Sequence, residues 1–216
     1  MKFLLFEQFI NEANIQSVID RLGEVDTVKI EDFDAYVNHF ISLGAKRLSG
    51  GSSAEVLQFK NGVIKIYGPI NDPGMTRYLS FCLSNSKNPF VPRMPKILKS
   101  WATEEDRWIF AIFMENLTPA RKDFEKDLNN LLLNDTFQLG FRFGTSKSKD
   151  NRFFSMLKEV VMKYSKASTE KDIDSVLNFL QGAINKYKYS IDFGPQNWMM
   201  RGNQLVLIDP FWPDME

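Results

Sequence analysis

The most constraining feature of the sequence is a pair of short apolar runs near its end, with a polar side chain on each side. Residues 198–208 contain the two runs, separated by Gly202 and Asn203, and this pattern is typical of a β-hairpin. Asn197 precedes the hairpin, Asp209 follows it, and Asp192 lies just upstream. Because the two ends of a hairpin lie together, we predict that these side chains meet, giving one candidate base and two candidate metal-ligand oxygens.

Length and charge limit the classes of protein to which the chain could belong. Its 216 residues suffice for one sizeable core or two small lobes. The 27 basic residues balance the 27 acidic ones, so we expect neither nucleic acid nor a membrane as a partner. No apolar run reaches the roughly 18 residues of a membrane-spanning helix. Cys82, the single cysteine, has no partner for an intramolecular disulfide, and its apolar neighbours favour a buried thiol over a nucleophile.

The order of expected elements indicates an α+β protein. Helices are expected within 13–43, ending before Gly44. The further expected elements are a hairpin over 48–67, a helix at 75–83, strands at 96–101 and 108–114, and helices at 122–139, 151–166 and 172–188. The stretch 144–150 is the one segment that looks flexible. Strands first and helices afterwards predict two segregated lobes.

Two further features suit phosphoryl transfer from a nucleotide, which needs a backbone cover over the phosphates, a cation, metal ligands and a carboxylate near the attacking hydroxyl. A small-residue turn without bulky side chains consists of Gly50, Gly51, Ser52 and Ser53. Lys65 places an ammonium on an otherwise apolar strand. Taken alone, an ordinary hairpin turn explains the first feature, and a solvent-facing lysine explains the second.

With these residues in this order, the chain resembles the protein-kinase-like fold, which includes the aminoglycoside phosphotransferases, over about 48–210. The resemblance implies that Lys65 binds the α/β-phosphates of ATP, that Asp192 is the catalytic-loop aspartate, and that Asn197 and Asp209 hold Mg²⁺. The Ser-x-Asp and Asp-Pro sequences are similar to those of the early serine/threonine protein kinases of short-tailed coliphages.

The same resemblance implies a domain organisation and an adenine site. A β-rich N-lobe with its hinge would span 46–117, and a truncated helical C-lobe would span 118–216. The hinge would present the backbone of Glu115 and Leu117 to the adenine.

Three departures from the family pattern stand out. The helix at 75–83 has no Glu to pair with Lys65, so either Glu55 or Asp72 substitutes, or Lys65 is held only when nucleotide is bound. No basic residue lies between Asp192 and Asn197, so the charge of the transferring phosphoryl group would be stabilised from elsewhere. The sequence also ends soon after Asp209, which leaves no room for an activation loop or for substrate-docking helices.

The first residues carry a second resemblance. Residues 1–12 resemble the capsid-targeting peptide of internal head proteins of large tailed phages, and Ile10-Asn11-Glu12-Ala13 fits the cleavage pattern. This implies that the prohead protease cuts after Glu12 and that the protein is packaged in the phage head and injected into the host cytoplasm. Apolar residues at 3, 6, 9 and 10 fit an uncleaved packing helix equally well. Residues 13–45 would form a helical extension.

Together these patterns predict an ATP- and Mg²⁺-dependent serine/threonine protein kinase that acts on a host protein. A pseudokinase-type module that binds and inhibits a host factor is the alternative from another class. A small-molecule kinase is a third, although the acceptor pocket of such enzymes lies in C-terminal helices that this sequence lacks.

Overall fold

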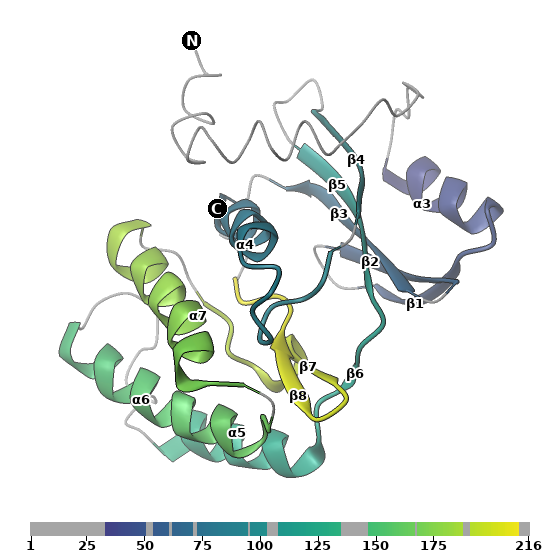
Figure 1. Cartoon of the computed structure of the whole chain (residues 1–216). Coiled ribbons are helices and arrows are strands. Elements are labelled where there is room, and N and C mark those ends of the chain that lie inside the picture. Colours follow the sequence, from purple (N-terminus) through teal and green to yellow (C-terminus); the bar gives the residue numbers. More distant parts are fainter. Residues whose placement is uncertain are drawn as a thin grey trace. The chain divides into compact units, whose positions relative to one another are not determined.

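The computed structural model describes most of the chain after the predicted leader. The described residues are 33–50, 54–60, 62–70, 73–94, 96–102, 108–134, 147–166, 168–187 and 191–211. They fall into two compact units, shown in Figure 1. Unit 1 comprises Met1–Pro73 and Arg93–Asn116, and unit 2 comprises Gly74–Pro92 and Leu117–Glu216.

Unit 1 is built on a five-stranded antiparallel sheet, with strand order β1-β2-β3-β5-β4. The strands are β1 (Lys46–Gly50), β2 (Ala54–Phe59), β3 (Gly62–Ile70), β4 (Lys96–Ala102) and β5 (Trp108–Glu115). Helix α3 (Phe33–Ser42) precedes the sheet in the chain. The central strand β3 pairs with β2 on one side and β5 on the other, so residues of β3 have cross-strand neighbours on both sides.

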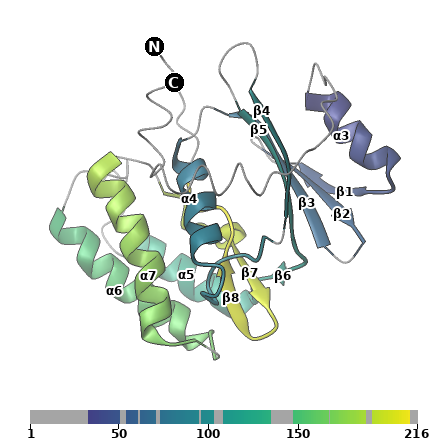
Figure 2. The ribbon, with the colours of Figure 1, turned by 45° about the horizontal axis from the view of Figure 1, so that its top comes forward.

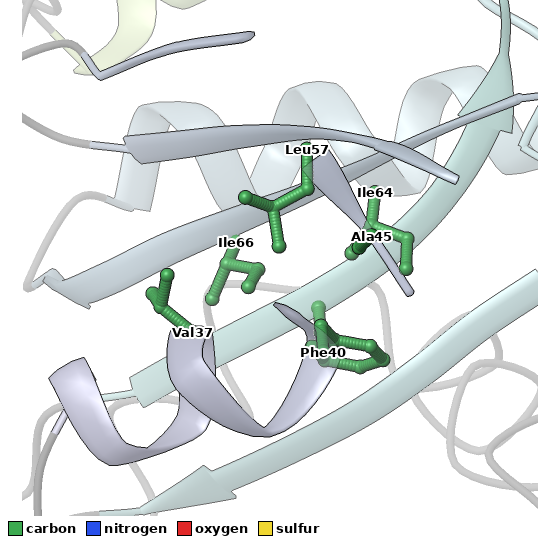
Figure 3. Close-up of a cluster of buried hydrophobic side chains, with 7 residues drawn as sticks. Val37, Phe40, Ala45, Leu57, Ile64 and Ile66 are labelled. Atoms are coloured by element: carbon green, nitrogen blue, oxygen red, sulfur yellow. The ribbon is translucent and has the colours of Figure 1, made fainter. Parts of the chain in front are cut away.

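One face of this sheet packs against α3 (Figure 3). Val37 and Phe40 of the helix are spaced to point the same way, and both are buried. They meet a set of buried sheet side chains that includes Leu57, Ile64 and Ile66. Because Ile64 and Ile66 are two residues apart on one strand, they lie on the same face, and the residue between them lies on the other.

Unit 2 combines helices with a small antiparallel sheet of strand order β6-β7-β8. Its strands are β6 (Thr118–Pro119), β7 (Trp198–Arg201) and β8 (Gln204–Leu207). Its helical elements are α4 (Pro73–Ser84, all but its first residue), α5 (Lys122–Asn134), α6 (Lys147–Lys163), α7 (Glu170–Gly182), a π-helical turn η1 (Ala183–Tyr187) and a 3-10 turn η2 (Pro195–Asn197). Helix α6 contacts both α5 and α7, and Figure 2 shows the three together.

The helices of unit 2 bury one apolar face each. In α7 the buried positions are Ile173, Val176, Leu177 and Leu180, the 3–4 spacing of an amphipathic helix. Thr169 caps the start of this helix, because its side chain accepts from the Asp172 amide while the Asp172 carboxylate accepts from the Thr169 amide. The ring of Phe124 on α5 packs edge-on against Trp198 of the hairpin, with centroids 5.8 Å apart.

The observed elements confirm the α+β class and most of the predicted helices and strands. Two predictions need correction. Strand β1 was not predicted, because its Ser49-Gly50 end runs into the small-residue turn and shows little apolar alternation. The stretch 144–150 was predicted to be flexible, but it is helical from Lys147 onward. The polar residues there form the first turn of α6. Within the described part of the chain, no helix has the length and apolar character needed to cross a membrane.

Candidate functional site

The predicted hairpin is present as strands β7 and β8. Trp198 pairs with Leu207 and Arg201 pairs with Gln204, so the turn consists of Gly202 and Asn203. Gly202 has φ = +61°, a left-handed conformation that costs glycine little and other residues more. The Gly-Asn dipeptide therefore fixed the register of the hairpin in the way the sequence indicated.

Backbone hydrogen bonds draw the three predicted polar positions together at the open end of the hairpin. The Ile208 amide donates to the Asn197 carbonyl at 2.8 Å, which ties the two ends to each other. The Asp192 amide donates to the Pro210 carbonyl at 2.7 Å. Asp209 lies between these two tied positions. The backbone segments that carry Asp192, Asn197 and Asp209 therefore lie together, and the predicted meeting of their side chains stays a prediction.

The side chain of Asn197 is oriented by its own loop. It is 8% exposed, and its Nδ2 donates to the Asp192 carbonyl oxygen at 3.0 Å. Since a carbonyl accepts only from the NH₂ group, this bond fixes which end of the amide is which. The Oδ1 atom is left as the acceptor that could bind a cation.

The candidate metal ligands are one amide oxygen and one carboxylate. In the described ranges, no three His, Cys, Asp or Glu side chains are grouped to hold a metal ion. Asn197 and Asp209 supply one amide oxygen and one carboxylate. Mg²⁺ prefers oxygen ligands and is usually held by one or two carboxylates plus substrate phosphates and water. Asn197 and Asp209 therefore supply oxygen ligands of a kind that fits Mg²⁺.

Both carboxylate oxygens of Asp192 accept hydrogen bonds from the same loop. The Gly194 amide donates to Oδ1 at 2.8 Å, and the side-chain Nε2 of Gln196 donates to Oδ2 at 3.0 Å. Apart from its place next to Asn197, nothing in the sequence indicates a role for Gln196. Because each carboxylate oxygen has two lone pairs, Asp192 is oriented but can still accept a bond from a substrate hydroxyl.

Lys65 lies on β3 in unit 1, on the sheet face opposite the cluster of Figure 3. It pairs with Val56 on β2 and with Ile112 on β5, so its stem runs between apolar neighbours. Only 8% of the residue is exposed, and its Nζ lies 4.6 Å from the centre of the Tyr67 ring. A cation–π contact of this kind offsets part of the cost of burying an ammonium.

Glu55 was one of the two residues proposed to pair with Lys65, and the structure contradicts this. Glu55 pairs in register with Ile66, the residue next to Lys65, so its side chain lies on the other face of the sheet. Its Oε2 atom lies 3.2 Å from Nε of Arg47 on β1. The other candidate, Asp72, lies outside the described residues.

The predicted hinge includes Glu115 and Leu117. Strand β5 ends at Glu115, whose amide donates to the Arg93 carbonyl at 3.1 Å. The Glu115 carboxylate in turn accepts from the Arg93 amide at 2.7 Å. The amide of Glu115 is therefore used inside unit 1, and Leu117 belongs to unit 2. Of the small-residue turn, Gly50 ends β1, and the next three residues lie outside the described part.

Cys82 lies on α4 and is 1% exposed, as predicted. Burial raises the pKa of its thiol far above the ordinary value, so the reactive thiolate is suppressed. These observations favour the predicted buried thiol over a nucleophile.

Comparison with known proteins adds no family assignment: no family model matches the sequence, and no curated protein matches it.

Proposed function

We propose that the protein is an ATP- and Mg²⁺-dependent phosphotransferase of the protein-kinase-like fold, which transfers the γ-phosphoryl group to a serine or threonine hydroxyl of a host protein. The observation that carries the proposal is the convergence of Asp192, Asn197 and Asp209 at the open end of the hairpin, held by backbone hydrogen bonds. Phosphoryl transfer needs a carboxylate near the attacking hydroxyl and oxygen ligands for the metal ion. Asp192 would be that carboxylate, and Asn197 and Asp209 would be the ligands.

The order of elements supports the same proposal. A buried lysine on the third strand of a β-rich unit is followed by a helix, two more strands, and a connection into helices. The loop with Asp192 and Asn197 then precedes a hairpin that ends close to Asp209. Protein kinases carry their lysine, catalytic-loop Asp and Asn, and metal-binding Asp in this order along the chain.

Each residue has a stated role in the proposal. Lys65 would bind the α- and β-phosphates, and its apolar surroundings would strengthen that attraction by excluding water. Asn197 and Asp209 would hold the magnesium ion, which neutralises phosphate charge when bound. Asp192, with its carboxylate held by Gly194 and Gln196, would orient or deprotonate the attacking hydroxyl.

Thermal melting tests the nucleotide part of the proposal. A ligand at a hundred times its dissociation constant stabilises the folded state by about 2.7 kcal/mol. Millimolar Mg²⁺-ATP should therefore raise the melting temperature of the wild type, and Asp209→Ala should lose most of the increase. The control is Asp34→Ala, which removes an exposed carboxylate on α3 and should show the same rise in melting temperature as the wild type. Absence of any shift in the wild type would contradict the proposal.

A second candidate function is a binding module of the same fold that inhibits a host factor without catalysis. The specific observations that favour it are the lack of any acidic side chain on α4 and the engagement of both Asp192 oxygens within their own loop. Such a module predicts inhibition of its target with no phosphate transferred. Stabilisation by Mg²⁺-ATP alone does not separate the two functions, whereas a transfer assay does.

A further inference from the structure

Helix α4 contains a tyrosine whose hydroxyl bonds to a strand far along the chain. Tyr78 is fully buried, and its hydroxyl donates to the Leu207 carbonyl at 2.5 Å. The two residues are 129 positions apart, and both belong to unit 2. Leu207 is the last residue of β8 and lies two positions before Asp209.

The same residue is also bonded through its amide. Strand β8 is at the edge of the small sheet, and the Leu207 amide donates to the Phe90 carbonyl at 2.9 Å. Phe90 belongs to the loop that follows α4. Both polar backbone groups of Leu207 are therefore bonded to α4 or to its following loop, and edge groups of this kind are otherwise left to solvent.

Arg201 on the neighbouring strand β7 holds the same loop. Its Nη1 and Nη2 atoms donate to the carbonyls of Pro89 and Val91, each at 2.9 Å. Because both donors belong to one planar guanidinium, they restrict the orientation of the loop as well as its distance from β7. Helix α4 and its loop are thus attached to both strands of the hairpin, which explains why they belong to the compact unit of the hairpin.

We infer that Tyr78 is a positioning residue for Asp209: its hydroxyl holds the end of β8, and the backbone bond from Ile208 to Asn197 holds the next residue from the other side. The inference rests on the proposed function, because it assigns Asp209 to magnesium. Helix α4 has no acidic side chain, and Tyr78 connects this helix to the segment that leads to Asp209.

The substitution Tyr78→Phe isolates the hydroxyl. Phe81, Phe179 and Phe211 have ring centroids 6.2–6.4 Å from that of Tyr78, and phenylalanine keeps these contacts. The matched control is Tyr164→Phe, which removes another tyrosine hydroxyl bond in the same unit, 2.8 Å to Asp127. A merely structural role predicts the same behaviour for both variants.

The experiment measures two quantities on the full-length protein. The first is the Mg²⁺ concentration that gives half of the stabilisation by ATP in thermal melting. We expect Tyr78→Phe to raise it about three- to tenfold, the change in equilibrium constant that one neutral hydrogen bond typically produces. Tyr164→Phe should lower the melting temperature, but its half-effective Mg²⁺ concentration should equal that of the wild type. The second is amide hydrogen exchange at residues 207–209 without ligand, which Tyr78→Phe should accelerate and the control should not.

The outcomes separate this inference from the proposed function. A wild type that Mg²⁺-ATP does not stabilise would overturn both. A stabilised wild type with the same Mg²⁺ midpoint and exchange rates in Tyr78→Phe would overturn the positioning role alone. If Tyr78→Phe is recovered unfolded, Arg201→Lys replaces it, since lysine cannot bond both loop carbonyls in the same geometry and should raise the Mg²⁺ midpoint in the same way.

Discussion

At the scale of single residues, the loop from Asp192 to Asn197 shows how a short segment can orient its own functional groups. Its amides and side chains supply a partner for each oxygen of Asp192 and fix the amide of Asn197. The hairpin pattern allowed us to predict that the segments of Asn197 and Asp209 lie together, because a hairpin brings its two ends together. The role of Gln196 could not be predicted, since it depends on the turn that the backbone makes at Gly194.

Gly194→Ala tests the orientation of Asp192. A Cβ atom at this position would overlap the side-chain amide of Gln196 and displace it from Oδ2 of Asp192. We expect phosphate transfer to slow by about three- to tenfold, as for the loss of one hydrogen bond. The free energy of unfolding should fall by about 1 kcal/mol at most, because the displaced atoms end a flexible side chain.

Gly182→Ala is the control for this change. A Cβ atom there meets nothing within 4 Å, and the residue ends helix α7. Alanine should leave transfer unchanged and stabilise the protein by about 0.5–1 kcal/mol. Equal transfer rates for Gly194→Ala and the wild type would show that the Gln196 bond has no part in the activity.

At the scale of elements, most local patterns were predicted correctly, including the β2–β3 and β7–β8 hairpins, whereas the side-chain contact proposed between Glu55 and Lys65 was not. Hairpin β7–β8 and helices α4, α5, α6 and α7 follow from periodicity and turn residues. The assignment of Glu55 to Lys65 was wrong because it needed the register of β2 against β3, which puts the two side chains on opposite faces. The bond from Tyr78 to Leu207 joins elements that no local pattern connects.

Two leucines of unit 1 provide a matched test of the α3–sheet core. Leu57 is fully buried in the cluster of Figure 3, whereas Leu48 is 56% exposed where the β1–β2 register shifts. Leu57→Ala should lower the free energy of unfolding by about 2–5 kcal/mol through lost burial and a residual cavity. Leu48→Ala should change it by about 0.5 kcal/mol or less. Chemical denaturation would measure both, and similar losses would contradict the assigned core.

Helices α5 and α6 are joined by an ion pair whose effect should depend on pH. Lys163 Nζ lies 2.6 Å from Oδ2 of Asp127, and this hydrogen bond, with that from Tyr164, lowers the pKa of Asp127. A lowered pKa in the folded state means that the pair stabilises the protein above the unfolded pKa of about 3.9 and stops doing so as pH falls through the folded value.

Asp127→Asn should therefore melt at a lower temperature than the wild type at pH 7, with a difference that shrinks in the acid range. Measurement of both proteins at pH 7 and near pH 3 tests the sign of this dependence. A difference in melting temperature that stays constant over this range would show that the ionised form of Asp127 contributes nothing.

At the scale of the whole molecule, the prediction of delivery from the phage head depends on the first residues, which lie outside the described part. Cleavage after Glu12 by a prohead protease predicts that protein from purified virions begins at Ala13, while protein expressed without the protease begins at Met1. Mass spectrometry of both would decide, and Glu12→Ala should block cleavage. If the protein in virions begins only at Met1, or if virions contain none of the protein, packaging with cleavage is contradicted.

The central claim is that Asp209 belongs to a phosphotransferase site, and phosphate transfer from γ-labelled ATP tests it most directly. Wild-type protein with Mg²⁺ should label itself or a protein in host lysate, and Asp34→Ala should label equally well. The rate of phosphate transfer by Asp209→Ala should be at least about a hundredfold lower than that of the wild type, because the substitution removes the single carboxylate assigned to magnesium. No transfer by the wild type, or equal transfer by Asp209→Ala, would contradict the account.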